Sequence, residues 1–135
     1  MGRRYAILED NDRAIAGRLE ALRTCLPALI ADRVCAVMVI GSVSEGRARD
    51  HSDLDLLLVL RAGLPRRSDY TWWDVVVAPH LPVPAAGPSG FPIAPVFVGR
   101  GAKSSAEPNL RRALEIGIPL WDPEGFFHDE SRPRA

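Results

Sequence analysis

Residues 34–60 read VCAVMVIGSVSEGRARDHSDLDLLLVL, and their pattern indicates a β-sheet. It contains two apolar runs, at 34–40 and 54–60, separated by a polar segment that opens with Gly41 and Ser42. Short apolar runs rich in branched side chains, bounded by glycine and polar residues, are typical of buried strands. The sequence therefore predicts two strands joined by a Gly-Ser turn. The second run is apolar on both faces, so it should lie in the centre of the sheet.

Two carboxylates stand at the start of the second strand. Asp53 and Asp55 are two positions apart, and such residues on a strand point to the same face, about 6–7 Å apart. Carboxylate oxygens are ligands that Mg²⁺ prefers, and turn N–H groups with a serine hydroxyl, here Ser42, can bind phosphate. The pattern predicts metal-dependent chemistry on a nucleoside triphosphate. The alternative is a polar turn whose aspartates only terminate the second strand.

These residues resemble the signature of the nucleotidyltransferase superfamily that includes DNA polymerase β. The best match is its small stand-alone branch, the minimal nucleotidyltransferases, with Gly-Ser, a glycine four residues after the serine, and Ser-Asp-x-Asp-Leu. The chain fills these positions in register with Gly41, Ser42, Gly46, Ser52, Asp53, Asp55 and Leu56. The resemblance implies a nucleotidyltransferase-type fold of the α/β (α+β) class, a small mixed β-sheet with helices packed on one side.

The resemblance also implies a reaction and roles for the residues. A hydroxyl attacks the α-phosphorus of a triphosphate in line, and pyrophosphate leaves. Asp53 and Asp55 would hold two Mg²⁺ ions, which lie about 3.5–4 Å apart in such sites. Gly41 would let the backbone approach the phosphates, and Ser42 would donate hydrogen bonds to them.

Other residues are expected to support nucleotide binding. Gly46 would relax the turn after the serine, and Ser52 would orient the aspartate loop. Arg47 could contact the triphosphate tail, although a single loop arginine is more often solvated. Trp72 and Trp73 could stack on a base, but tryptophan more often belongs to a core or an interface.

Active members of the superfamily use a third carboxylate on a neighbouring strand. The strand expected in this place covers 93–98, where the family often has Asp near the start and this chain has Ala94. The other candidate is Asp74, which completes a triad if residues 72–77 form a strand beside Asp53. If those residues form a helix, Asp74 is a solvated helix residue. Losing the third carboxylate would leave nucleotide binding in place and remove much of the rate.

The rest of the chain fits the same small fold. Apolar residues recur at helical spacing over 12–31, which predicts an amphipathic helix that Pro27 kinks or divides. The other expected elements are a strand near the sheet edge over 93–98 because of Pro95, a short helix from Pro108 to Gly117, and an extended segment over 119–121.

Composition limits the class of protein. The 135 residues suffice for one domain with its own core, expected over 1–127 and followed by a flexible tail at 128–135. A net charge of zero, from 17 basic and 17 acidic residues, argues against a broad nucleic-acid surface. Cys25 and Cys35 in apolar surroundings suggest buried thiols in a reducing cytosol. No apolar run approaches the ~20 residues of a membrane span, so we expect a cytoplasmic protein.

The leading hypothesis is a metal-dependent nucleotidyltransferase that moves a nucleoside monophosphate, with AMP from ATP as the first choice, onto a hydroxyl. In small stand-alone relatives the acceptor is often a partner protein, as in toxin–antitoxin pairs, and this acceptor is implied by the resemblance alone. The chain is too short for the extra helical domain of small-molecule transferases, and a homodimer could supply the missing wall. The second hypothesis is a catalytically degenerate nucleotide-binding or protein-interaction module of the same fold.

Overall fold

The computed structural model describes residues 2–41, 54–81, 93–101 and 108–127, with side chains in the first segment described from Ala16 onward. The expected tail at 128–135 lies outside these ranges. The elements, in chain order, are α1 (Gly2–Ile30), β1 (Val34–Ile40), β2 (Leu54–Leu60), α2 (Arg67–Trp72), η1 (Trp73–Val77), η2 (Ala78–His80), β3 (Ile93–Gly99), α3 (Pro108–Ile116) and β4 (Ile118–Trp121).

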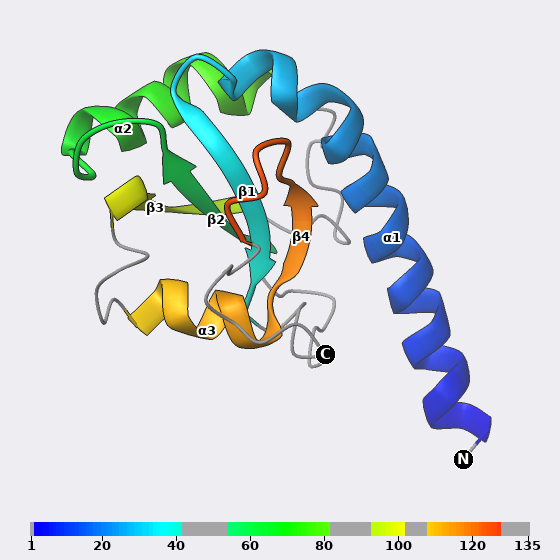
Figure 1. Cartoon of the computed structure of the whole chain (residues 1–135). Coiled ribbons are helices and arrows are strands. Elements are labelled where there is room, and N and C mark those ends of the chain that lie inside the picture. The colour runs from blue at the N-terminus through cyan, green and yellow to red at the C-terminus, as the bar shows by residue number, and fades with distance from the viewer. Residues whose placement is uncertain (1, 42–53, 82–92, 102–107, 128–135) are drawn as a thin grey trace.

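The four strands form one mixed sheet in the order β3-β2-β1-β4 (Figure 1). β1 is antiparallel to both β2 and β4, and β2 is parallel to β3. β1 and β2 have the bounds predicted from their apolar runs, and β2 is central and buried, as expected. A mixed α+β fold with a small sheet is therefore confirmed.

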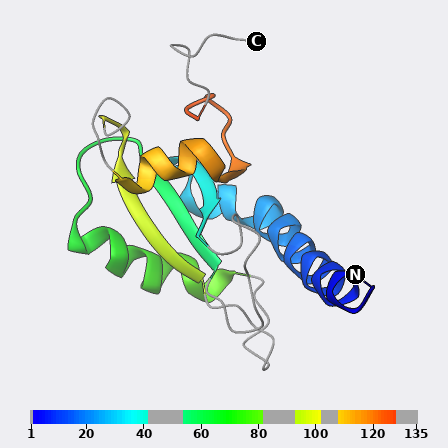
Figure 2. The ribbon, with the colours of Figure 1, turned by 90° about the horizontal axis from the view of Figure 1, so that it is seen from below.

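Helices cover both faces of this sheet, whereas the sequence predicts helices on one side only. α1 and η1 pack on the face that carries Leu56 and Leu58, and α3 packs on the face that carries Leu57 and Val59. Figure 2 shows α3 on the side of the sheet opposite to α2. The physical reason is that β1 and β2 are apolar on both faces, so each face needs a cover.

A β-bulge in β1 determines which of its residues face α1 and which face α3. The pairing of β1 with β2 shifts between Val34, opposite Leu60, and Ala36, opposite Val59. As a result Cys35 and Ala36, although adjacent, both belong to the core on the α3 side. Such a bulge places two residues of one strand opposite one of its partner. Beyond it the usual alternation resumes, which fixes the faces of all residues up to the end of β1.

Residues 72–77, for which the sequence left helix and strand open, are helical: they end α2 and form η1. Trp73 and Val77 are buried against the sheet, at a spacing of four residues. This helix also protects the edge strand β3. The Phe97 N–H donates a hydrogen bond to the Tyr70 hydroxyl of α2 (3.3 Å). Pro95 stands two positions before Phe97, so a backbone N–H at this position would point to the same side of the strand. Proline has no N–H, so none is exposed there.

α1 is one continuous helix of 29 residues with Pro27 inside it, so the proline does not divide it. Its described core residues begin at Leu19 and continue through Leu22, Leu26 and Ile30. The helix starts about ten residues before the expected position, and Figure 1 shows that its first half extends away from the sheet. None of the helices in the described ranges combines the length and the apolar character needed to cross a membrane.

Candidate functional site

Three strands bring the predicted site to one end of the sheet. Ile40, the last residue of β1, pairs with Asp55 of β2, and Asp55 pairs with Ala94 of β3. Gly41 follows Ile40 directly. The described part of the site therefore consists of the end of β1 and the starts of β2 and β3, side by side.

Gly41 and Asp55 lie in direct contact. Gly41 has a positive φ of 75°, a conformation that glycine adopts without the cost that a side chain would add. A Cβ built on Gly41 would lie 2.3 Å from Asp55 Oδ2 and 3.3 Å from its Cγ. The space that any other residue would need is thus filled by the Asp55 carboxylate. Because residue 41 is a glycine, the Asp55 carboxylate can lie directly against the end of β1.

The strand alternation assigns the Asp55 side chain to the face covered by α3. Leu54 and Leu56 belong to the core on the α1 side, and Leu57 belongs to the core on the α3 side. Asp55, between Leu54 and Leu56, therefore points toward α3. Ala94 lies opposite Asp55 and two positions before Val96, which packs on the same α3-side core. The β3 residue beside Asp55 carries only a methyl group, which cannot bind a metal.

Asp74 does not supply the third carboxylate, and this candidate of the sequence analysis is corrected. It is an exposed residue of the helical turn η1. η1 is held by Trp73 and Val77 against the face opposite to the one toward which Asp55 points. The strand interpretation would have required residues 72–77 to join the sheet beside Asp53. They form a helix, and β3 takes the place next to β2.

The remaining predicted site residues lie outside the described part of the chain, and their roles stay predictions; they are Ser42, Gly46, Arg47, Ser52 and Asp53. Among the described residues no group of three or more His, Cys, Asp or Glu side chains could hold a metal ion. Asp55 is the one predicted metal ligand within the described ranges, and it offers the hard oxygen ligand that Mg²⁺ prefers. Together with Asp53 it would form the predicted pair of carboxylates for Mg²⁺.

The two tryptophans, which the sequence suggested could stack on a base, differ in burial: Trp73 is buried in the core, and Trp72 is partly buried. Trp73 is 2% exposed and belongs to the core. The Arg33 guanidinium lies 4.6 Å from the centre of the Trp72 ring. Arg33 also contacts Asp69 (3.2 Å), and the Asp69 carboxylate accepts a hydrogen bond from the Arg66 N–H (2.8 Å) at the start of α2. Arg33, in the turn before β1, thereby fixes α2.

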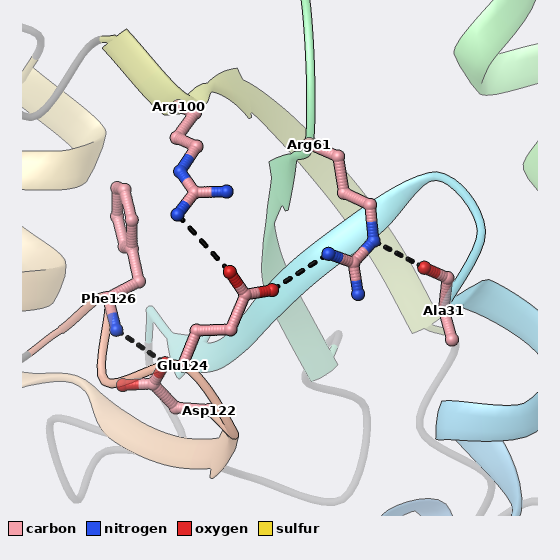
Figure 3. Close-up of polar contacts among 6 residues, drawn as sticks. All are labelled: Ala31, Arg61, Arg100, Asp122, Glu124 and Phe126. Carbon is pink, nitrogen blue, oxygen red and sulfur yellow. Dashed lines mark hydrogen bonds and ion pairs between the residues drawn. The ribbon is translucent and has the colours of Figure 1, made fainter.

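A second polar cluster, missed by the sequence analysis, lies at the opposite end of the sheet (Figure 3). Arg61, after β2, donates to the Ala31 carbonyl and to Glu124 (2.7 Å), and Arg100, after β3, contacts the other Glu124 oxygen (3.2 Å). The hydrogen bond from Arg61, together with both guanidinium charges, lowers the pKa of Glu124. The cluster ties the turn after β4 to the sheet. No local motif marks it, because 63 positions separate Arg61 from Glu124.

The same turn is closed by Asp122. Its carboxylate accepts hydrogen bonds from the backbone N–H groups of Phe126 (2.7 Å) and Phe127 (2.9 Å). Both phenylalanines are buried in the core on the α3 side, with their rings edge to face at 5.4 Å. The polar contacts of this turn therefore position apolar side chains over the sheet and have a structural role.

No family model, no curated protein and no solved structure matches this chain.

Proposed function

We propose that this protein is a metal-dependent nucleotidyltransferase that moves a nucleoside monophosphate, with AMP from ATP as the first choice, to a hydroxyl of a partner protein. The observation that supports it is the contact between Asp55 and Gly41. This contact places a carboxylate against the glycine that precedes Ser42 in the sequence. A metal-bound triphosphate requires a carboxylate for the metal and turn N–H groups for the phosphates.

The proposed chemistry assigns roles to this chain's own residues. Gly41 lets the backbone approach the phosphates, Ser42 donates its backbone N–H and its hydroxyl to them, and Arg47 contacts the triphosphate tail. Asp53 and Asp55 hold Mg²⁺, which when bound neutralises the charge that develops on the phosphate oxygens. The acceptor oxygen forms a bond to the α-phosphorus, the bond to pyrophosphate breaks, and the hydroxyl proton leaves to solvent.

The acceptor and the setting are part of the same proposal. The transferase would work in the cytoplasm, and its acceptor would be a toxin-like partner protein that presents a serine, threonine or tyrosine hydroxyl. The wall of the acceptor pocket would come from that partner or from a second copy of this chain.

The test is transfer of a labelled nucleotide. The full chain is incubated with α-labelled ATP, Mg²⁺ and cell lysate, beside Asp53→Asn and Asp55→Asn. Asp74→Asn serves as the matched control because Asp74 is exposed on the other side of the sheet. Labelling of a protein band should be lost in the first two variants and retained in the control. Labelling that survives Asp55→Asn refutes the proposed site.

A second function, binding without transfer, is favoured by one specific observation. The strand position beside Asp55 is Ala94, and Asp74 lies on a helix over the opposite face. A site with two carboxylates could hold nucleotide and metal while lacking a group to complete the reaction.

A gain-of-function variant distinguishes the two functions. Ala94→Asp adds a carboxylate on the face of Asp55 at the neighbouring strand position, and Ala94→Asn is its uncharged control. If the chain is a binding module, the wild-type protein binds Mg²⁺ and ATP without transfer, and Ala94→Asp gains transfer that Ala94→Asn lacks. Transfer by the wild-type protein excludes the binding-only function. Absence of both transfer and ATP binding excludes both functions.

A further inference from the structure

Residues 122–127, after β4, form a strap over one end of the core on the α3 side. Phe126 and Phe127 of this strap are 7% and 8% exposed and pack in that core. Hydrogen bonds within the strap hold its shape. The Asp122 carboxylate accepts from the N–H groups of both phenylalanines, and the Gly125 N–H donates to the Asp122 carbonyl (3.3 Å). Because these bonds do not involve the sheet, the strap can move away from it and keep them.

Glu124 connects the strap to the sheet. One of its carboxylate oxygens pairs with Arg61 after β2 (2.7 Å), and the other pairs with Arg100 after β3 (3.2 Å) (Figure 3). We call these three residues the latch. Their side chains are between 36% and 49% exposed, so water reaches both ion pairs. Exposed ion pairs contribute little to stability and are weakened by salt. Both pairs depend on a single carboxylate, so its departure releases the strap from β2 and β3 together.

The strap covers the thiol of Cys35. The β-bulge of β1 turns this residue to the α3 side, where it belongs to the same core as the two phenylalanines. Cys35 lies between the β1 residues that pair with Val59 and Leu60, directly before Arg61 of the latch. Its side chain is 0% exposed. A thiol buried in this way does not react with dissolved reagents while its cover is in place.

We propose that the 122–127 strap opens as one unit while the sheet stays folded, and that the latch controls this opening. Opening withdraws the two phenylalanines from the core on the α3 side and exposes Cys35 to solvent. A segment held by few buried apolar contacts opens at a lower free energy than the whole fold. The state of the latch therefore sets access to this face of the sheet and to its thiol.

The test measures how fast a neutral maleimide alkylates Cys35 in the folded full chain, with Cys25→Ala to remove the other thiol. Glu124→Gln breaks both ion pairs and keeps the shape of the side chain, whereas Arg100→Gln breaks one. Alkylation should become about tenfold faster in the first variant and about threefold faster in the second. The matched control is Glu20→Gln, which breaks an exposed ion pair within α1 (2.8 Å) and should leave the rate unchanged.

Arg100→Gln separates opening of the strap from a direct effect of charge on the thiol. Burial raises the pKa of Cys35, and the positive charge of Arg100 opposes this rise. Without Arg100 less of the thiol is ionised, so a purely electrostatic effect slows alkylation, whereas release of the latch speeds it. Salt gives a second measurement. It should speed alkylation when the latch is intact, because it screens the ion pairs, and have much less effect in Glu124→Gln.

A cysteine on the other face of the sheet distinguishes opening of the strap from unfolding of the whole chain. Val37→Cys, combined with Cys25→Ala and Cys35→Ala, places a thiol in the core on the α1 side. Cys35 should react about tenfold faster than this thiol, with a weaker dependence on urea. Circular dichroism checks that each variant is folded. The proposal is overturned if the two thiols react equally fast, if Glu124→Gln does not speed the reaction of Cys35, or if Arg100→Gln slows it.

Discussion

Gly41 is the position where the addition of a single methyl group should perturb the candidate site most. A Cβ there lies 2.3 Å from Asp55 Oδ2, well inside contact distance, so either the carboxylate or the end of β1 must move. The φ of 75° adds a second cost, because a side chain in the left-handed region costs roughly 1–2 kcal/mol. Moving the neighbouring atoms to make room for the added methyl group adds roughly 1–3 kcal/mol. We expect Gly41→Ala to lower the free energy of unfolding by roughly 2–5 kcal/mol.

Gly63→Ala is the control that separates the two costs. Gly63 has nearly the same φ, 79°, but a Cβ there has no heavy atom within 4 Å. It should therefore cost only the conformational part, roughly 1–2 kcal/mol. Both substitutions restrict the unfolded chain equally, so this effect cancels in the difference. The assay is equilibrium urea unfolding of both variants, followed by fluorescence of the tryptophans and by circular dichroism.

A double-mutant cycle then tests the contact itself. In Asp55→Ala the carboxylate is gone, and the nearest remaining atom of residue 55 is its Cβ, 3.5 Å from the added methyl group. This is an ordinary van der Waals distance. On this background Gly41→Ala should cost no more than Gly63→Ala does. If Gly41→Ala costs the same with and without the Asp55 carboxylate, or no more than Gly63→Ala in the wild-type chain, the Asp55 carboxylate is not what excludes a side chain at position 41.

Two further predictions concern the contacts that hold the helices and the last turn. Asp69→Ala should lower the free energy of unfolding by roughly 2 kcal/mol, because the buried carboxylate accepts from the Arg66 N–H and pairs with Arg33. Thermal unfolding should show it, and Asp74→Ala, in the exposed part of the same helix, should change stability by less than about 0.5 kcal/mol. Glu124 has a pKa below its ordinary 4.5, so its ionised form stabilises the fold above that pH, and this contribution is lost as the pH falls through the lowered pKa. The stability difference between the wild-type chain and Glu124→Gln should therefore be constant at neutral pH and shrink below about pH 4.5, and a difference independent of pH would contradict the assignment.

The sequence predicted the strands well where chemistry marks both ends of a run. β1 ends at Ile40, directly before Gly41 with its positive φ, and β2 begins after Asp53, so both apolar runs had clear limits. The start of α3 at Pro108 and the break at Gly117 were found for the same reason. These are local signals, and a local signal can be read without knowledge of the rest of the chain.

The sequence could not decide features that depend on contacts between distant segments. Residues 72–77 contain tryptophans and valines that favour strands, and the helix forms because Trp73 and Val77 can be buried together on the sheet. The order of the elements along the chain does not show on which face of the sheet α3 packs. The Arg61–Glu124 contact joins residues too far apart for any spacing rule.

The same packing that stabilises the sheet decides which side chains can meet at the candidate site. A slip of one residue would turn Asp55 to the α1 side, and the buried leucines on either side of it prevent that slip. Asp55, Ile40 and Ala94 are therefore neighbours because the core requires that register. Within the described strands, a third carboxylate beside Asp55 would have to stand at position 40 or 94, and both are apolar. Whether the proposed site could catalyse transfer therefore depends on two things. One is the residue at position 94 of β3, and the other is the set of residues between β1 and β2, which includes Asp53.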